Sequence, residues 1–289
     1  MFFDRITRSY ALAKSSWNVL WTDKKLLVFP VLSGICCLLV LATFAIPFAI
    51  KPELVNLMWG KEGVNPPWWA YPLAFAYYFC NYFVIVFCNS ALVSCALIRF
   101  NGGEPTLGDG LRAAWNRLPQ IAAWAAVAAT VGMILKALER RGTIGEIVSS
   151  LLGMAWSIVT FFVVPVLVVE KLGPIAAVKR STAILRKTWG EALIGNWGIG
   201  AFMFLLFLPV IVFAFVIAVA FAANPILGIA ALAMTGVYVL VLMAVSSAMH
   251  GIYITALYQY ASCGRVPIGF DQQTLAGAFS PKTKKSGWF

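Results

Sequence analysis

Three short stretches of this chain share one pattern of apolar and polar positions. In each, apolar side chains recur every three or four residues, a tryptophan stands near the end, and a long apolar segment follows. The tryptophans are Trp17, Trp115 and Trp189, and the first two each begin a literal Trp-Asn-x-Leu. Such spacing of apolar positions indicates an amphipathic helix. The pattern therefore predicts three surface helices, each leading into a membrane-spanning region.

Each predicted helix carries its tryptophan on an apolar ridge and its charges elsewhere. The ridges comprise Ile6, Tyr10, Ala13, Trp17 and Leu20 in the first stretch, Leu107, Leu111, Trp115 and Leu118 in the second, and Ile175, Val178, Thr182, Leu185 and Trp189 in the third. The third is the most basic, with Lys179, Arg180, Arg186 and Lys187. We expect the ridges to lie among lipid headgroups, with tryptophan as the anchor and the basic side chains near anionic lipid.

The long apolar segments predict an integral membrane protein. The chain is 61% hydrophobic and 11% charged over 289 residues, whereas soluble domains are roughly 45–50% apolar. A bilayer is crossed by about 20 apolar residues. Six spans are expected, at 26–50, 71–98, 120–135, 147–169, 197–222 and 226–260. The first is longer than a signal-peptide core of roughly 7–15 residues, so we expect it to be retained.

The last two predicted spans can be divided in more than one way. From Trp197 to Gly264 no residue carries a fixed charge, and Asn224-Pro225 is the strong turn signal within the segment. Residues 226–260 form either one long helix or two.

The fold class expected is an all-α integral membrane protein in which six transmembrane helices form three repeats. Each repeat is a cytoplasmic amphipathic interfacial helix followed by a transmembrane hairpin. The repeat units are 1–100, 103–170 and 173–264, which together form a single membrane domain, 1–264. Breaker clusters at Asn101-Gly102-Gly103 and Leu172-Gly173-Pro174 separate the units. Residues 265–289 form a basic cytoplasmic tail.

The distribution of basic residues predicts the orientation. With six spans, 17 Lys and Arg residues lie on the side of the termini and 5 on the other. Because cytoplasmic loops are enriched in Lys and Arg, both termini are assigned to the cytoplasm of a bacterial inner membrane. The same bias accounts for the net charge of +11, so no nucleic-acid partner is expected.

No enzyme, cofactor or metal chemistry is expected. The sequence has no G-x-S-x-G, H-E-x-x-H or P-loop motif, and its six cysteines show no C-x-x-C spacing. All six lie in or beside apolar segments, where cysteine behaves as a small hydrophobic residue.

Several polar residues within the predicted spans could line a path for a solute. His250 is the one histidine, with Ser246 and Tyr253 at helical spacing, and Asn81 and Asn89 lie in the second span. Intramembrane polar groups mark transport sites in some proteins. Hydrogen bonds between neighbouring helices explain the same residues and are favoured.

In the fourth span, small or hydroxyl-bearing side chains form a stripe, and a proline follows. The stripe is Ser150, Gly153, Ser157 and Thr160, and the proline is Pro165. Close helix packing explains the stripe. The proline predicts a kink, and a transport role for freed carbonyl groups is the less favoured reading.

The two ends of the chain resemble a bacterial family of uncharacterised six-span membrane proteins. The resemblance rests on residues 11–20 and 26–34 at the start and on 256–261 and 264–271 at the end. That family implies no functional residues. An amphipathic helix leading into an apolar run with Pro30 near its start is also similar to the CysZ/EI24-type, sulfate-permease-like proteins.

Two functions remain open at this point. The favoured one is a non-enzymatic integral protein that interacts with membrane lipids through its basic interfacial helices and forms a homo-oligomer. The alternative is a channel or permease for a small solute, such as an anion that the basic cytoplasmic face concentrates. A water-filled polar path would favour the alternative.

Overall fold

The computed structural model describes residues 2–51, 67–187, 200, 203–204 and 206–271, and over these residues the chain is helical with no strand. Two compact units are present. The first combines the chain up to Pro30 with Ala96–Glu104 and with the chain from Ile184, and the second comprises Val31–Cys95 and Pro105–Ala183.

Five helical segments of the described chain are long and apolar enough to cross a membrane. They are η1 (Lys24–Leu27) with α2 (Val28–Ile50), α4 (Ala70–Phe100), α6 (Leu118–Glu139), α7 (Thr143–Val159) with α8 (Val163–Val169), and α12 (Pro225–Cys263). The prediction of a membrane protein with several apolar helices is supported. The predicted span at 197–222 lies partly outside the described residues, and its described helix α11 (Pro209–Ala223) is shorter, so a sixth span stays a prediction.

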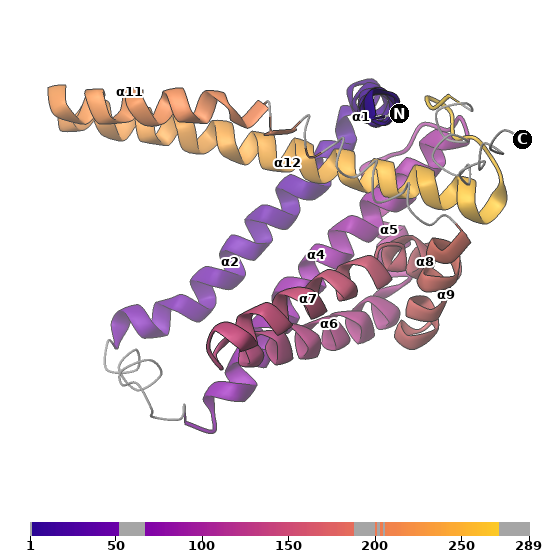
Figure 1. The fold of residues 1–289 in the computed structure, drawn as a ribbon, viewed down its shortest axis with the longest axis horizontal. Helices are drawn as coiled ribbons and strands as arrows, with labels where there is room; N and C mark the ends of the chain where they lie inside the picture. Colours follow the sequence, from indigo (N-terminus) through magenta and orange to yellow (C-terminus); the bar gives the residue numbers. More distant parts are fainter. Residues whose placement is uncertain (1, 52–66, 188–199, 201–202, 205, 272–289) are drawn as a thin grey trace, which may run out of the picture. The chain divides into compact units, whose positions relative to one another are not determined.

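The last two helices form a hairpin in the first unit, with α11 lying along α12 (Figure 1). The turn is at Asn224-Pro225, as predicted: the Asn224 side chain accepts a hydrogen bond from the Ile226 N–H at 2.8 Å and caps α12. Proline at the first helical position costs no hydrogen bond. Residues 225–263 form one continuous helix of 39 residues, which answers the question of one helix or two.

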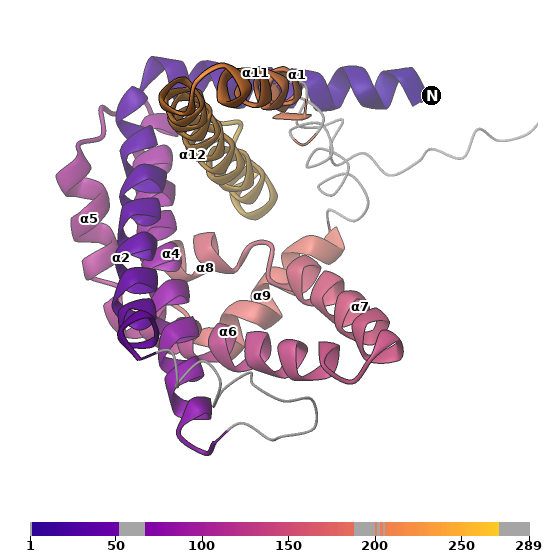
Figure 2. The same cartoon turned by 90° about the vertical axis from the view of Figure 1, so that its left-hand side faces the viewer.

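The C-terminal half of α12 forms the core of the first unit. Met249, Ile252, Tyr253 and Leu257 are fully buried there. Helix α1 (Phe2–Thr22) packs across α12 at a wide angle (Figures 1 and 2). At 1.5 Å per residue, its 39 residues make α12 about 58 Å long, roughly twice the hydrocarbon thickness of a bilayer.

The chain after α12 turns back onto the end of α4 within the same unit. Gly264 adopts the left-handed conformation that ends α12. The Ile268 N–H then donates to the Phe100 carbonyl at 3.3 Å, and the rings of Phe100 and Phe270 meet edge to face at 5.7 Å. Residues 265–271 of the predicted tail are therefore held by protein contacts, and the rest of the tail lies outside the described residues.

In the second unit, α6 and α7 form a hairpin and lie side by side in Figure 1. Gly145 faces the α6 backbone so closely that an added Cβ would overlap the Leu138 carbonyl, and the Ser149 hydroxyl donates to the Leu135 carbonyl at 2.9 Å. Of the predicted stripe, Gly153 lies against α6, whereas Ser150 and Ser157 are exposed. Gly145 and Ser149 line the contact with α6 in their place. Four-residue spacing of small side chains allows such close approach.

Two shorter helices complete the second unit, and one of them continues into the first. Helix α5 (Leu107–Trp115) precedes α6, and α9 (Pro174–Lys187) follows α8. Together with α1 they occupy the three stretches in which surface helices were predicted, although Trp189 lies outside the described residues.

Candidate membrane-interface site

Helix α5 begins with a capping box. The Thr106 hydroxyl accepts a hydrogen bond from the Asp109 N–H at 3.2 Å, and the Asp109 carboxylate accepts from the Thr106 N–H at 3.0 Å. These bonds satisfy two donors that a helix start leaves unpaired. The Thr106 hydroxyl also donates to the Asp109 carboxylate at 2.6 Å, and this bond, followed by the one from the Thr106 N–H, lowers the pKa of Asp109. The local sequence therefore fixes where this nine-residue helix starts.

The tryptophan ridge of α5 faces away from the protein. Gly110 and Ala114 are buried, whereas Leu111 is 36% exposed and Trp115 is 68% exposed. Arg112 is exposed as well. A leucine and a tryptophan on the open side of a short helix leave an apolar surface that water solvates poorly.

Helix α1 shows a different arrangement. Leu12, Ser16, Val19 and Leu20 are buried, while Trp17 is half-buried at the edge of this face. The Trp17 ring meets Trp21 edge to face at 5.3 Å, and the Lys24 ammonium lies 5.0 Å from the centre of the Trp21 ring. The side chains of Ile6 and Tyr10 lie outside the described residues.

The buried side differs from the predicted ridge most clearly on α5. The ridge residues Ala13 and Leu20 of α1 and Leu185 of α9 are buried, whereas Leu111 and Trp115 of α5 are exposed. The residue five positions before each tryptophan is buried, namely Leu12, Gly110 and Ile184. The residue directly before Trp17 and Trp115 is buried too, as Ser16 and Ala114. One residue turns a helix by about 100°. The protein-facing side is therefore rotated away from the tryptophan, which stands at its flank in α1 and on the open side in α5.

Helix α9 forms hydrogen bonds to the backbone where the fourth predicted span is interrupted. The span is interrupted at 160–162, before Pro165, and the regular hydrogen-bond pattern of the helix stops there. The buried Ser181 hydroxyl donates to the Val159 carbonyl at 2.7 Å and accepts from the Phe162 N–H at 3.1 Å. Unpaired backbone groups are costly in an apolar environment. One side chain of α9 thus satisfies both of them.

The basic residues predicted on α9 differ in their exposure and in their partners. Lys179 and Arg186 are exposed. The Arg180 Nε donates to both Glu170 carboxylate oxygens, at 2.8 and 2.9 Å, so its charge is partly balanced by the protein. Lys187 is the last residue of α9, and its side chain and all of Trp189 lie outside the described part. Although Lys171 is the next residue in the sequence, the cation that binds the Glu170 carboxylate is Arg180.

The polar residues predicted within the spans fall into two groups that belong to different units. Asn81 and Asn89 are half-buried on α4 in the second unit, and the Asn81 amide donates to the Tyr77 carbonyl of its own helix at 2.9 Å. Ser246, His250 and Tyr253 lie on α12 in the first unit. Among the described residues, no group of three His, Cys, Asp or Glu side chains could hold a metal ion.

Sequence reasoning missed two structural features of these helices. Ser181 is one of two hydroxyl residues on α9. Its role depends on the break at 160–162, for which the nearest signal in the sequence was Pro165. Gly145 and Ser149 could have been found from the four-residue spacing Gly145-Ser149-Gly153, which is as regular as the stripe that was chosen.

The comparisons with known proteins identify a family and no activity. No curated protein and no solved structure matches the chain. A family model matches residues 69–269, well over half of the chain, and it carries no functional description. The chain therefore belongs to DUF6159, a family of unknown function.

Proposed function

We propose that this protein is a non-enzymatic integral protein of a bacterial inner membrane that interacts with lipids through its basic surface helices. The observation that supports this most is α5: Leu111 and Trp115 point outward although Gly110 and Ala114 hold the helix on the protein. An indole with an apolar body and a polar N–H suits the headgroup layer.

Exposed cations lie on the same helices. They include Lys14 on α1, Arg112 on α5, and Lys179 and Arg186 on α9. Each Lys or Arg near an anionic leaflet contributes about 1 kcal/mol of attraction. With both termini in the cytoplasm, as the distribution of Lys and Arg favours, all three helices would meet the inner leaflet.

Association into a homo-oligomer is part of this proposal. Many large apolar side chains of the α11–α12 hairpin are exposed, and Ile211, Phe215 and Met234 are each more than 70% exposed. In a membrane such side chains meet either lipid or a second copy of the chain. The transport alternative has less support, because the backbone groups freed at the break between α7 and α8 are bound by Ser181.

Fluorescence quenching tests the lipid contact directly. Variants that keep either Trp115 or Trp17, with the other tryptophans replaced by phenylalanine, would be reconstituted with lipids brominated close to the headgroup. We expect strong quenching of Trp115 and weaker quenching of Trp17, which is half-buried. Unquenched Trp115 would mean that protein covers this ridge, and the proposal would then fail.

A further inference from the structure

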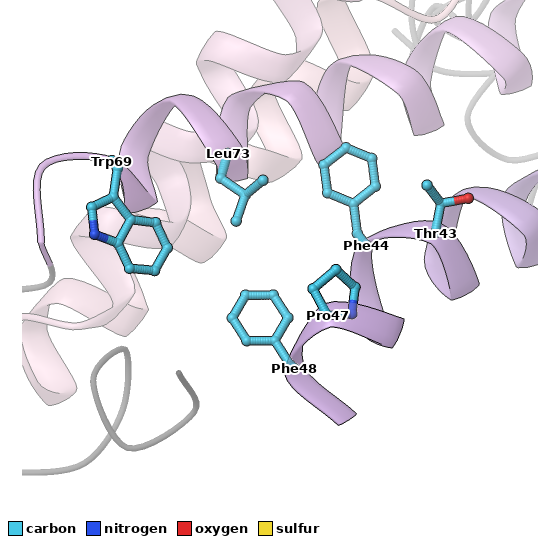
Figure 3. Close-up of a pocket in the computed structure, with 6 residues that line it drawn as sticks. All are labelled: Thr43, Phe44, Pro47, Phe48, Trp69 and Leu73. Carbon is cyan, nitrogen blue, oxygen red and sulfur yellow. The ribbon is translucent and has the colours of Figure 1, made fainter. Parts of the chain in front are cut away.

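An apolar groove lies between α2 and α4 in the second unit, where α2 ends and α4 begins. Its walls are Thr43, Phe44, Pro47 and Phe48 from α2, with Leu73 from α4 and Trp69 directly before α4. Figure 3 shows Trp69 and Leu73 on one side and Phe44 and Phe48 on the other. The volume is about 240 Å³, larger than the apolar cavity of roughly 150 Å³ that takes up benzene.

The chemistry of the walls selects an apolar guest. Five of the six side chains are hydrocarbon or aromatic, and the Thr43 hydroxyl donates to the Leu39 carbonyl at 2.8 Å. A polar guest would lose hydrogen bonds to water without gaining any from these walls, which costs free energy. The groove belongs to two helices that are long and apolar enough to cross a membrane. In a membrane, such helices are surrounded by the acyl chains of lipids.

A cation stands one turn beyond the groove. Lys51 is exposed, and its backbone N–H donates to the Pro47 carbonyl at 3.0 Å, which fixes the backbone at the end of α2. On the α4 side, Trp68 is 81% exposed and Tyr71 is 54% exposed. Aromatic residues of this kind mark the level of the membrane–water interface. With these aromatic residues at that level, the groove would lie in the apolar layer just below Lys51.

We propose that this groove binds one acyl chain of an anionic phospholipid, with the lipid phosphate at Lys51. This site is at the opposite ends of α2 and α4 from η1 and Phe100, so it is separate from the surface helices. With cytoplasmic termini, it takes lipid from the outer leaflet.

Lipid retention tests the site in the full chain. The protein would be purified in mild detergent, and the phospholipid that remains bound would be counted by native mass spectrometry. We expect one phospholipid per chain in the wild type and in Leu38→Trp, a matched change at an exposed position of α2. Leu73→Trp fills the groove and should release that lipid. Equal retention in the two variants would overturn the proposal.

Headgroup preference tests the role of Lys51. A variant with Trp69 as its single tryptophan would be placed in phosphatidylcholine vesicles that contain a brominated lipid, either phosphatidylglycerol or phosphatidylcholine. One lysine near a charged headgroup predicts about a fivefold preference for the anionic lipid, and Lys51→Gln should abolish it. A tryptophan at position 38 should show no preference. Quenching of Trp69 without preference would mean bulk lipid only, and absent quenching would mean that protein covers the groove; either result contradicts the proposal.

Discussion

Helices α1 and α5 share the motif Trp-Asn-x-Leu, but they bury different sides of the helix around it. Helix α1 buries Leu12, Val19 and Leu20 within the protein and leaves Trp17 at the edge of the contact. Helix α5 buries a glycine and an alanine and leaves its tryptophan 68% exposed. A shared motif therefore predicts a helix at the surface, while the residues beside the motif decide which side meets protein.

The difference follows from side-chain size on the buried side. The leucine and valine side chains of α1 bury apolar surface, and each Å² removed from water contributes a free energy of about 25 cal/mol. This burial stabilises the contact between α1 and α12. Gly110 and Ala114 on α5 offer little area and instead let the helix lie close to its neighbours. The larger apolar side chains of α5, Leu111 and Trp115, lie on its exposed side and are free to contact lipid.

The largest effect is expected from truncating the apolar contact of α1. Leu20→Ala removes a side chain that is 2% exposed and leaves a cavity, which costs about 2–5 kcal/mol. The matched change Leu111→Ala affects a side chain that is 36% exposed and should cost within about 0.5 kcal/mol. Thermal unfolding of both variants in the same detergent measures the difference. Equal shifts in midpoint would show that α1 and α5 are held alike.

Enlarging the buried side of α5 should cost somewhat less. Ala114 is 0% exposed, and Ala114→Leu overpacks its site at a cost of about 1–3 kcal/mol. The neighbouring change Trp115→Leu, on the open side, should leave detergent stability nearly unchanged. If Ala114→Leu is tolerated as well, the small side of α5 is not a tight contact, and the comparison with α1 loses its physical basis.

Removing the cap of α5 is expected to have a smaller effect. Thr106→Ala deletes the hydroxyl that accepts from the Asp109 N–H, and loss of an N-cap typically costs about 1 kcal/mol. Hydrogen exchange should speed up in the first turn of α5. Thr22→Ala is the control, because the Thr22 hydroxyl donates to the Asn18 carbonyl of α1 and caps no helix start. Equal protection in wild type and Thr106→Ala would contradict the capping role.

Acid should weaken the same cap gradually. Because the folded pKa of Asp109 is lowered by hydrogen bonds from Thr106, its contribution is present above the ordinary aspartate pKa and disappears as the pH falls through the folded value. Hydrogen exchange in α5 should therefore rise at low pH after correction for intrinsic rates. Asp109→Asn should flatten this dependence, and an unchanged pH profile would show that the carboxylate does not hold the helix start.

Much of the helical architecture could be predicted, because it depends on local signals. Continuous apolar runs predicted the long helices, and Asn224-Pro225 predicted the turn before α12. The break at 160–162 was misplaced because it depends on a hydroxyl from another helix, Ser181. No local pattern encodes such a partner.

The candidate site could be predicted less well, since burial depends on neighbours. Helical spacing identified the stretches around Trp17 and Trp115. The prediction then considered only the side of each helix that carries the tryptophan, and not the side that contacts protein. Small residues such as Gly110 and Ser16 carry no apolar signal, so their buried positions went unnoticed. The pairing of Arg180 with Glu170 likewise depends on where α8 ends relative to α9.

The contact between α1 and α12 has a consequence for synthesis. Helix α1 ends at Thr22 and α12 begins at Pro225, so about 200 residues must be translated before the partner of α1 exists. At roughly 5–20 residues per second, this takes on the order of 10 to 40 seconds. During that time Leu12 and Leu20 lack the cover that they have in the finished protein. A nascent chain that stalls in this interval exposes an uncovered apolar helix, which chaperones and proteases can recognise.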